Sequence, residues 1–399
     1  MDEHGLKSDG TSDVHSVSLA KGIVPQVEHM GRSFAASDTG HYSLVRPFDV
    51  VYTRSPLASF KLGIVKQHRR DYNAIVSPLY GVFAPKNRHV GLLVEAFFES
   101  PARAFRYLDP LAQKGAKNTI QLSNERFLSG SLCLPEDEDE QQKVAECLGS
   151  LDELIAAEGR KLEALGQHKE GLMARLFPQG DESVPRLRFP EFQDAGHWER
   201  EPLSKLCDIK HGYAFEGEFF SDEGKYVLLT PGNFYERGGY RDRGEKQKYY
   251  TGEIPRDYVL NRGDLLVAMT EQAAGLLGSS ILVLDSDKFL HNQRLGLVTK
   301  KIGVAWSNEF FFYVFNTQPV REAIHGSASG MKVRHTSPTK IGQVVVSFPA
   351  SLSEQQRIAD CLSALDARIA AQTGKLDALK QHKQGLLQQL FPSLEGEAQ

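Results

Sequence analysis

The sequence predicts an α+β protein with a pseudo-two-fold internal repeat, in which two mixed α/β domains are joined by two long antiparallel coiled-coil helices. Three observations support this prediction. A long segment with a helical pattern occurs twice. A mixture of strand-like and helical runs precedes each copy, and these two globular parts share a weaker repeat.

The repeated segment runs from Glu140 to Pro178 and again from Glu354 to Pro392. The two copies align without a gap, so every position keeps the sequence spacing that separates Glu140 from Glu354, and more than half of the positions are identical. A chance match of this length is not credible, so the segment is an internal duplication. Each copy ends in Leu-Phe-Pro, and proline ends a helix.

Apolar residues form a narrow seam along each copy, in steps that alternate between four and three positions, which is the heptad spacing of a coiled coil. The seam residues are Val144, Leu148, Leu151, Ile155, Leu162, Leu165, Leu172 and Leu176 in the first copy, and Ile358, Leu362, Leu365, Ile369, Leu376, Leu379, Leu386 and Leu390 in the second. Polar residues interrupt the seam at Glu158 and Lys169, matched by Gln372 and Lys383. Such residues lower stability but can fix the register of two helices.

A narrow seam on a helix about 55 Å long cannot be buried by that helix alone. We expect the two copies to pair with each other in antiparallel, because the segment between them is long enough to return the chain. This pairing gives a rod with a globular domain at each end. The alternative is that each helix packs on its own domain as an ordinary amphipathic helix.

The composition is that of a globular protein, with 41% hydrophobic residues and a net charge of −4 over 399 residues, so bulk charge gives no argument for a nucleic-acid partner. The acidic run at 136–140 is expected to be a solvated helix start. The four cysteines show no C-x-x-C spacing, which argues against a zinc site or a disulfide framework. There is no long apolar run and no signal-peptide pattern, so a cytoplasmic protein is expected.

Short apolar or β-branched runs between turn residues predict strands in both domains. In the first domain the predicted strands are 17–19, 50–53, 62–66, 74–76, 81–84, 118–122 and 131–134, and the predicted helices are 92–100 and 101–107. The polar stretch 1–16 is expected to be a loop or a frayed end. In the second domain the predicted strands are 226–229, 264–269, 280–284, 295–299 and 344–348, the predicted helices are 308–316 and 319–324, and 202–209 is expected to be a short helix or strand.

The two globular parts share a weaker repeat. The stretch from Arg46 to Val51 parallels the stretch from Arg262 to Leu266, and Asp49 matches Asp264 at nearly the same spacing as the repeated helices. Both parts continue with strands, a helical pair, a loop with glycine and lysine at 113–118 or 327–332, a last strand and the long helix. The chain is therefore two copies of a domain-plus-helix unit, which on a DNA duplex would address two half-sites.

This order of pieces resembles the specificity (S) subunit of type I restriction-modification systems over almost the whole chain. The most specific motifs are two Glu-Gln-Gln helix starts, each just after an apolar residue and a proline, and an Arg-Phe-Pro-Glu-Phe entry to the second domain. These motifs are Glu140-Gln141-Gln142 after Leu134-Pro135, Glu354-Gln355-Gln356 after Phe348-Pro349, and Arg188-Phe189-Pro190-Glu191-Phe192, followed by Trp198, Pro202 and Leu203.

The resemblance implies that each domain is a target recognition domain for one half of a bipartite, asymmetric site in double-stranded DNA. It implies that the paired helices space the half-sites and dock two methyltransferase (M) subunits, and that restriction (R) subunits join the complex. The S subunit would be non-catalytic and would need no cofactor, since the M subunits bring S-adenosylmethionine and the R subunits bring the ATP-driven translocase and nuclease. The implied parts are domains 1–135 and 198–350, spacer helices 136–178 and 351–392, a linker 179–197 and a tail 393–399.

The first domain departs from the family pattern in one respect. The second domain has an entry from Trp198 through Leu203 to Phe215, and the first domain has no counterpart of it. In the first domain, the sequence begins to resemble the family near the predicted strand at 17–19. We therefore expect a first domain that is short at its N-terminus and lacks an opening strand or helix.

The sequence offers no support for an enzyme. It has no G-x-x-x-x-G-K-[ST] phosphate loop and no H-E-x-x-H metal motif. Ser77-Pro78-Leu79-Tyr80 is only faintly similar to the Asn/Asp-Pro-Pro-Tyr motif of amino-methyltransferases, and a turn explains it better. His168 and His382 recur at equivalent helix positions, where a solvated face is expected rather than a metal site.

DNA contact needs Arg, Lys, Asn and Gln side chains that reach base edges or phosphates. Basic clusters in both domains are candidates, although a basic loop is more often simply solvated. The predicted DNA-binding residues are Arg69, Arg70, Lys117 and Asn118 in the first domain and Arg241, Arg243, Lys246, Lys248, Lys332 and Arg334 in the second. Two alternatives stay open: a coiled-coil adaptor protein that does not recognise DNA, and the recognition half of a type IIG-like enzyme whose catalytic domain this sequence does not contain.

Overall fold

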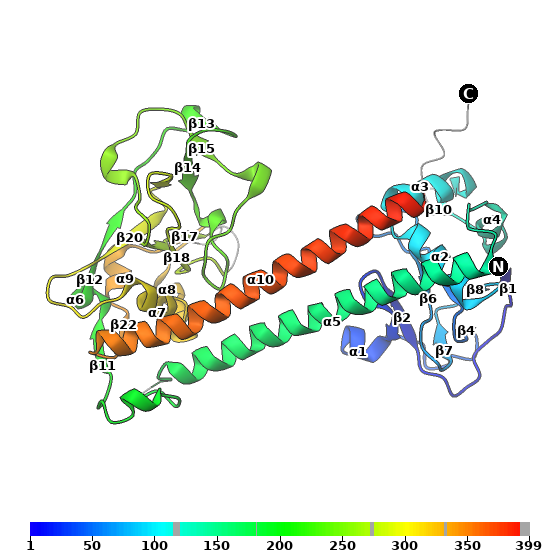
Figure 1. The fold of residues 1–399 in the computed structure, drawn as a ribbon, viewed down its shortest axis with the longest axis horizontal. Helices are drawn as coiled ribbons and strands as arrows, with labels where there is room; N and C mark the ends of the chain where they lie inside the picture. The colour runs from blue at the N-terminus through cyan, green and yellow to red at the C-terminus, as the bar shows by residue number, and fades with distance from the viewer. Residues whose placement is uncertain (115–119, 181, 272–274, 331–332, 392–399) are drawn as a thin grey trace. The chain divides into compact units, whose positions relative to one another are not determined.

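The computed structural model describes residues 1–114, 120–180, 182–271, 275–330 and 333–391 (Figure 1). The chain divides into two compact units. The first unit comprises residues 1–160 with 373–399, and the second comprises residues 161–372. Each unit therefore holds one globular part and a portion of both long helices.

Both predicted long helices are confirmed as continuous elements. They are α5, Glu138–Leu176, and α10, Leu352–Leu390, and each has 39 residues. A polar side chain just before each helix accepts a hydrogen bond from a first-turn backbone N–H, at 2.8 Å for Asp137 and 3.3 Å for Ser351. A proline follows shortly after each end, which prevents the helix from continuing.

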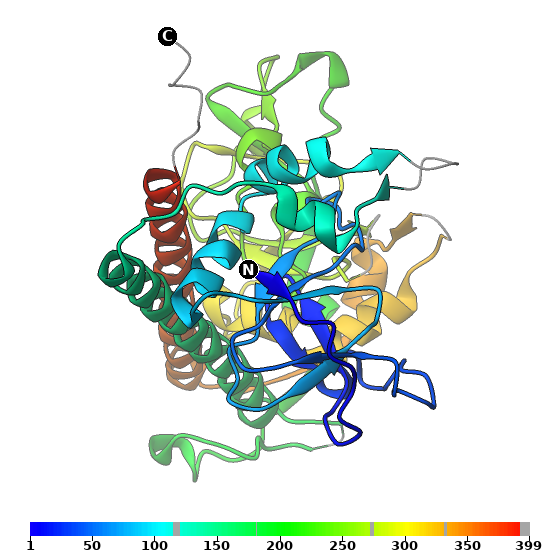
Figure 2. The same cartoon turned by 90° about the vertical axis from the view of Figure 1, so that its right-hand side faces the viewer.

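In the first unit, the start of α5 packs against the end of α10 (Figure 2). Leu148 of α5 shares a buried cluster with Leu387 and Phe391 of α10. Farther along α5, Glu158 pairs with Lys375. Residue numbers rise along one helix as they fall along the other, so the two segments are antiparallel.

In the second unit, the end of α5 packs against the start of α10. Leu176 lies in one buried cluster with Ile358 and Leu362, and Lys169 pairs with Asp366. These segments are also antiparallel. In both units, α5 and α10 contact each other and also pack on the globular part.

The polar seam positions of the two copies have equivalent partners. Lys169 pairs with Asp366 at 2.5 Å in the second unit, and Lys383 pairs with Asp152 in the first. The two lysines occupy equivalent positions of the repeated segment, and so do the two aspartates. Because a shift along the seam would separate both pairs, they favour a single register of the helices.

The globular part of the first unit is a mixed α/β fold. Its elements are β1 Asp2–Glu3, β2 His15–Ser18, β3 Gly22–Pro25, α1 Gln26–Met30, β4 Ser43–Val45, β5 Val50–Tyr52, β6 Val65–Gln67, β7 Ala74–Val76, β8 Gly81–Ala84, α2 Arg88–Phe98, α3 Pro101–Leu108, β9 Gln113–Lys114, β10 Ile120–Gln121 and α4 Asn124–Ser129. The main sheet has the order β1-β8-β5-β6 and is antiparallel. Val94 and Phe98 of α2 pack into one core with Val50 and Phe83 of this sheet.

The globular part of the second unit has more strands. Its elements are β11 Glu199–Pro202, α6 Leu203–Leu206, β12 Cys207–His211, β13 Phe220–Ser221, β14 Tyr226–Leu229, β15 Tyr249–Tyr250, β16 Leu265–Ala268, β17 Thr270–Glu271, β18 Ser280–Leu282, β19 Phe289–His291, β20 Leu295–Lys300, α7 Asn308–Phe315, α8 Gln318–Ser327, β21 Arg334–His335, α9 Pro338–Gly342 and β22 Val345–Phe348. One antiparallel sheet has the order β12-β20-β16-β18, and a second has the order β13-β15-β14-β19. The aromatic helix α7 fills the core against α10.

The predicted repeat within the globular parts has a structural basis. The carboxylates of Asp49 and Asp264 each accept from the backbone N–H three positions earlier, both at 2.8 Å. The residue before each aspartate has a left-handed backbone, with φ of 70° at Phe48 and 85° at Gly263. The strand that follows each aspartate is β5 or β16. Each is the third strand of a four-stranded sheet, in the orders β1-β8-β5-β6 and β12-β20-β16-β18.

Several predicted elements are confirmed and others are wrong. The strands at 74–76, 81–84 and 226–229 have the predicted bounds. The stretch 1–16 is not only a loop, because its residues include β1, which pairs with β8. No strand forms at 131–134, and the elements α1, β3, β4 and α4 were not predicted. The predicted domain boundaries stay a prediction.

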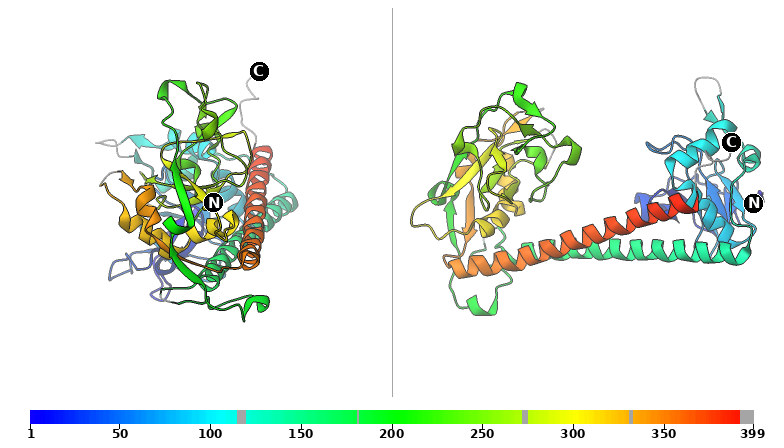
Figure 3. Two further views of the ribbon diagram at one scale, coloured as in Figure 1. Left: turned by 90° about the vertical axis from the view of Figure 1, so that its left-hand side faces the viewer. Right: turned by 45° about the horizontal axis from the view of Figure 1, so that its top comes forward.

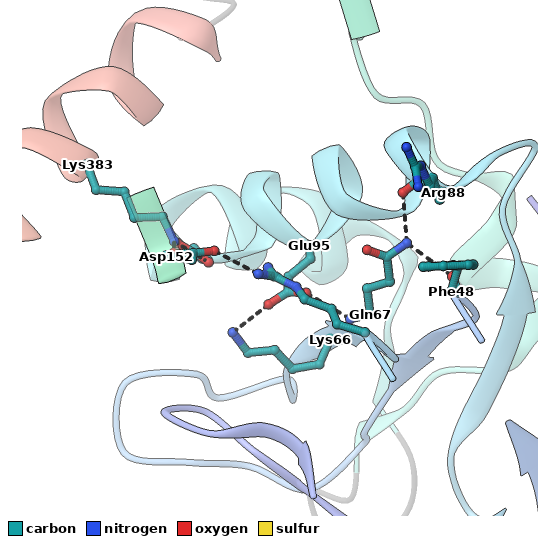
Figure 4. A network of polar contacts seen from close by, with 9 residues as sticks. Phe48, Lys66, Gln67, Arg88, Glu95, Asp152 and Lys383 are labelled. Atoms are coloured by element: carbon teal, nitrogen blue, oxygen red, sulfur yellow. Dashed lines mark hydrogen bonds and ion pairs between the residues drawn. The ribbon is translucent and has the colours of Figure 1, made fainter. Parts of the chain in front are cut away.

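A buried ion-pair network lies between β6, α2 and the long helices of the first unit (Figure 4). The Glu95 carboxylate, 5% exposed, contacts Lys66 Nζ at 3.0 Å and an Arg69 guanidinium nitrogen at 3.2 Å. Arg69 also contacts Asp152 of α5 at 3.0 Å, and Asp152 pairs with Lys383 of α10. Burial alone would raise the pKa of Glu95, but the two cations hold that pKa below its ordinary value.

We expect Glu95→Gln to lower the free energy of unfolding by about 3–5 kcal/mol at neutral pH, because it leaves two cations without their buried partner. Urea denaturation followed by circular dichroism measures this change. The carboxylate stabilises the fold above its ordinary pKa of 4.5, and this contribution is lost as pH falls through its lower folded-state pKa. The difference between the variant and the wild type should therefore shrink in acid.

The matched control is Glu138→Gln, which removes an exposed carboxylate paired with Lys86 at 3.1 Å. Exposed pairs contribute at most about 1 kcal/mol. An equal effect of the two substitutions would contradict the structural role of Glu95.

Candidate nucleic-acid interface

A loop rich in basic residues joins β14 to β15 in the second unit. We define residues 235–248 as the basic loop, which carries Arg237, Arg241, Arg243, Lys246 and Lys248. Strands β13 and β15 lie at the end of this unit away from α7 and α10 (Figures 1 and 3). The basic loop therefore runs from the α5 side of the unit, where Arg237 pairs with Glu170, toward this end, where β15 begins.

Two buried amides hold the base of the basic loop. Asn233 Oδ1 accepts from the backbone N–H and the hydroxyl of Thr230, at 3.0 and 3.1 Å. Asn233 Nδ2 donates to Gln247 Oε1 at 3.0 Å and to the Arg241 carbonyl at 3.4 Å. Gln247 Oε1 also accepts from the Arg243 N–H at 3.4 Å. Because these amides bind the loop backbone, they set its path without using its basic side chains.

Two glycines let the loop turn closely over the rest of the unit. Gly238 and Gly239 have φ of 87° and 94°, a region that L-residues with side chains rarely adopt. A Cβ on Gly238 would lie 2.2 Å from the side chain of Asn316. The Gly239 N–H donates to the Ser280 carbonyl at 2.9 Å, which ties the loop to β18.

Four of the predicted DNA-binding residues, Arg241, Arg243, Lys246 and Lys248, lie on the basic loop. Arg241 and Lys246 are exposed, and the Arg241 guanidinium lies 6.0 Å from the ring centre of Tyr235. Arg243 is partly buried and packs against Gly232, where an added Cβ would lie 3.1 Å from its guanidinium. This arrangement presents two guanidinium groups and an ammonium group on one loop.

Other basic residues of the second unit already have partners. Lys248 pairs with Asp222 at 2.5 Å, and Arg237 pairs with Glu170 of α5. Arg334 on β21 donates to the carbonyl of His325 at 2.9 Å and also contacts its ring. Lys332 lies outside the described residues.

In the first unit, the structure separates the predicted residues Arg69 and Arg70. Both side chains are exposed, 36% for Arg69, but the Arg69 guanidinium is held between Glu95 and Asp152. Burial would lower the pKa of Arg69, but the two carboxylates raise it above its ordinary value. Lys117 and Asn118 lie outside the described residues.

Residues 15–42 take the place of the basic loop in the first unit, and we define them as the counterpart loop. In this unit Val14 bridges β7 in parallel, and β4 pairs with β7 in antiparallel. In the second unit β14 pairs with β19 in parallel, and Val259 bridges β19 in antiparallel. The counterpart loop and the basic loop therefore join equivalent positions.

The counterpart loop is less basic than the basic loop and exposes more apolar surface. Val27 and Phe34 are each 58% exposed, and Met30 is 50% exposed. The Arg32 guanidinium lies 4.6 Å from the ring centre of Phe34. No basic cluster marks these residues in the sequence, so they were not predicted, although the repeat of the aspartate turns points to this region.

Features of other function classes have ordinary structural roles. The Tyr80 N–H donates to the Ser77 carbonyl at 3.0 Å, so this stretch is a turn as expected. His168 and His382 are exposed on their helices. Among the described residues, no cluster of three His, Cys, Asp or Glu side chains is placed to hold a metal ion, and no helix has the length and apolarity needed to cross a membrane.

Comparisons with known proteins agree with one another. A family model described as type I restriction modification DNA specificity domain matches residues 196–381. The chain is 22% identical over 264 residues to the type I restriction enzyme MjaVIII specificity subunit of Methanocaldococcus jannaschii, which covers 63% of this chain and 59% of that protein. It is 26% identical over 186 residues to the EcoBI specificity subunit of Escherichia coli, with coverage of 46% and 35%. The matches thus span less than two thirds of either relative.

A solved structure supports the fold over nearly the whole chain. The crystal structure of the type I restriction-modification system S subunit from M. genitalium is similar with a TM-score of 0.59, and the match covers 99% of this chain and 92% of that chain. The sequence identity is 12%, so this likeness bears on the fold alone.

We expect Asn233→Ala to loosen the basic loop, because it leaves the buried Gln247 amide and the Thr230 groups without their partner. The free energy of unfolding should fall by about 1–3 kcal/mol. Trypsin should cut faster at the loop residues Arg241 and Lys246, as measured by mass spectrometry of timed digests. Glu245→Ala, an exposed change in the same loop, is the control, and equal cleavage of the two variants would contradict the role of Asn233.

Proposed function

We propose that this chain is a specificity subunit of a type I restriction-modification system and that it recognises a bipartite, asymmetric site in double-stranded DNA. The observation that carries this proposal is the duplication. Two long helices of equal length each follow a mixed α/β unit, and the two units share an aspartate turn and a sheet order. Two similar units with different loops are suited to two different half-sites.

In the proposed complex, the basic loop contacts one half-site. Arg241 and Arg243 can donate two hydrogen bonds to a guanine edge in the major groove, and Lys246 can bind a phosphate. The buried amides of Asn233 and Gln247 hold the loop before DNA binds, so little ordering is required on contact. Lys248, Lys332 and Arg334 stay predicted DNA-binding residues.

The first unit would contact the other half-site through Arg70 and the counterpart loop. The exposed Phe34 and Met30 suit contact with bases or sugars, while Arg32 supplies charge near a phosphate. Arg69 would act mainly by positioning, because Glu95 and Asp152 engage its guanidinium. Lys117 and Asn118 stay predictions.

The two helices would form an antiparallel coiled-coil spacer that sets the gap between the half-sites. Each seam lysine meets an aspartate of the other helix, which supports one fixed register. In this role the chain performs no bond chemistry and uses no cofactor. It would dock two M subunits, which methylate a flipped adenine, and R subunits, which restrict unmodified DNA.

Adenine-methylation mapping tests this function in cells that carry the chain with its M partner. We expect a split motif with two defined halves. In the Arg241→Ala/Arg243→Ala variant, one half should become degenerate while the other stays unchanged, since each lost bidentate contact removes about 1–3 kcal/mol of discrimination. Lys205→Ala, an exposed change on α6, is the control. An unchanged motif in the double variant would contradict base recognition by the basic loop.

Lengthening the spacer tests its role as a ruler. We expect insertion of one heptad into both helices, after Gly159 and after Thr373, to widen the tolerated gap by about three base pairs, because one helical heptad adds about 10 Å. The same heptad inserted after Gly180, an exposed residue of the linker, should leave the gap unchanged. Methylation mapping measures both gaps, and an unchanged gap in the double insertion would refute the ruler.

A further inference from the structure

The counterpart loop of the first unit carries an exposed apolar segment at residues 27–34, which we define as the wedge. Val27, Met30 and Phe34 are each at least half exposed, although all three are apolar. Figure 1 shows α1, which carries the first two of these residues, at the edge of the first unit next to β2. Because water is a poor environment for three large apolar side chains on one short segment, the wedge is suited to a partner that removes them from water.

Hydrogen bonds hold the wedge in shape before it meets a partner. Gln26 Oε1 accepts from the Phe34 N–H at 2.7 Å and from the Ser33 hydroxyl at 3.2 Å. Gly31 has a left-handed backbone with φ of 73°, and its N–H donates to the Val27 carbonyl at 2.9 Å. Residues with a side chain rarely adopt this φ, so the glycine makes the turn between α1 and Phe34. The wedge therefore loses little conformational freedom when it binds.

The counterpart loop offers little positive charge. Apart from histidine it has two basic residues, Lys21 and Arg32, and Glu28 and Asp38 balance them. The Arg32 guanidinium lies 4.6 Å from the centre of the Phe34 ring, so it is stacked on the apolar wedge itself. In the basic loop, by contrast, basic residues outnumber acidic residues. The chief chemistry that the counterpart loop presents is therefore apolar contact.

A second guanidinium lies on the segment that anchors the counterpart loop. The rings of His15, His68 and Tyr72 contact one another, with centres 5.8 to 6.0 Å apart. His15 is the first residue of the loop, and Arg70 lies between His68 and Tyr72 in sequence. Arg70 is exposed, so the base of the loop provides a cation for a phosphate.

The position of the wedge favours DNA as its ligand. The counterpart loop and the basic loop join equivalent strands, because each follows a segment that pairs in parallel and precedes one that pairs in antiparallel with the same strand. The proposed function places the basic loop on one half-site. Its equivalent then lies against the other half-site, with the wedge as its most exposed apolar part.

The size of the wedge also separates DNA from a protein partner. A standard protein interface buries about 800 Å² on each partner. One fully buried aromatic side chain contributes about 150–250 Å², and the three apolar side chains of the wedge are already partly covered. The wedge is therefore too small to form a stable protein interface by itself. Apolar side chains of this size do fit a single step between base pairs.

We propose that the wedge inserts Phe34 and Met30 between two neighbouring base pairs of the half-site that the first unit contacts. Insertion unstacks this step and kinks the duplex. Steps of a pyrimidine followed by a purine, such as TA and CA/TG, unstack most easily. The wedge thus selects a step by its deformability, whereas the basic loop reads base edges. This inference rests on the proposed function, since it takes double-stranded DNA as the ligand of the first unit.

The fluorescence of 2-aminopurine, which rises when this base leaves the stack, tests the wedge. Methylation mapping first identifies the half-site of the first unit, which is the half that stays defined in the Arg241→Ala/Arg243→Ala variant. Duplexes with the mapped site then carry 2-aminopurine in place of one adenine at a time, and the purified complex of the chain with its M partner binds each duplex. The methylated adenines are excluded, because base flipping also raises the fluorescence.

We expect the fluorescence to rise several-fold at one pyrimidine–purine step and to stay low there with Phe34→Ala/Met30→Ala. Phe34→Ala alone should lower the affinity for DNA by about tenfold, as removal of a stacked aromatic side chain does. Phe105→Ala is the matched control, because it is the same substitution at an exposed position of α3. It should leave the signal and the affinity unchanged, and Phe34→Trp, which keeps a flat apolar ring, should retain the signal.

The salt dependence of binding separates apolar insertion from phosphate contact. A ring between bases neutralises no phosphate, so Phe34→Ala should leave the slope of log affinity against log salt concentration unchanged. Arg70→Ala should reduce the size of this slope by about one, because one phosphate contact is lost. A reduced slope in Phe34→Ala would contradict insertion.

The outcomes distinguish the wedge from the proposed function. A split motif without a 2-aminopurine signal outside the methylated adenines overturns the wedge and leaves the proposed function intact. The same holds for a first half without a pyrimidine–purine step, or for equal signals from the wild type and Phe34→Ala/Met30→Ala. If no methylation motif is found, the proposed function fails and the wedge fails with it. A signal at one step that is lost with the double variant and kept with Phe105→Ala supports the wedge.

Discussion

Each long helix carries a seam of similar apolar residues, and such a seam tolerates displacement by a whole heptad at little change in packing. The lysine–aspartate pairs remove this freedom. Lys383 meets Asp152 in the first unit and Lys169 meets Asp366 in the second, and a displaced register would leave four partly buried charges without partners. The contacts between α5 and α10 in both units depend on this electrostatic constraint.

The same charges also hold the globular parts on the helices. In the first unit, Asp152 binds Arg69, which shares Glu95 with Lys66 of β6 (Figure 4). In the second unit, the Tyr313 hydroxyl of α7 donates to Asp366 at 2.9 Å. In each unit, the aspartate that pairs with a seam lysine therefore also holds the nearby globular part. A change in that position would alter both together.

The sequence predicted what depends on local pattern and missed what depends on distant contacts. The helices were predictable because their seam is long and periodic. The strand β1 was not, because its two polar residues are a strand only by pairing with β8. The sequence identified the basic residues but not the acidic residues that pair with them. Arg69, for example, is held by Glu95 and Asp152, which are remote from it in sequence. No sequence motif marks Asn233 and Gln247. Their role could not be predicted, because it follows from the hydrogen bond that they form when buried together.

The two Glu-Gln-Gln starts show how a duplicated motif can keep one role and leave another open. Gln141 donates to the carbonyl of the preceding proline at 2.7 Å, and Gln355 does the same at 2.9 Å, so the glutamine has the same structural task in both units. The glutamate does not, because Glu354 is buried and bound by Arg188, while Glu140 faces solvent. An acidic residue near a helix N-terminus is favourable by itself, and that explains Glu140 alone.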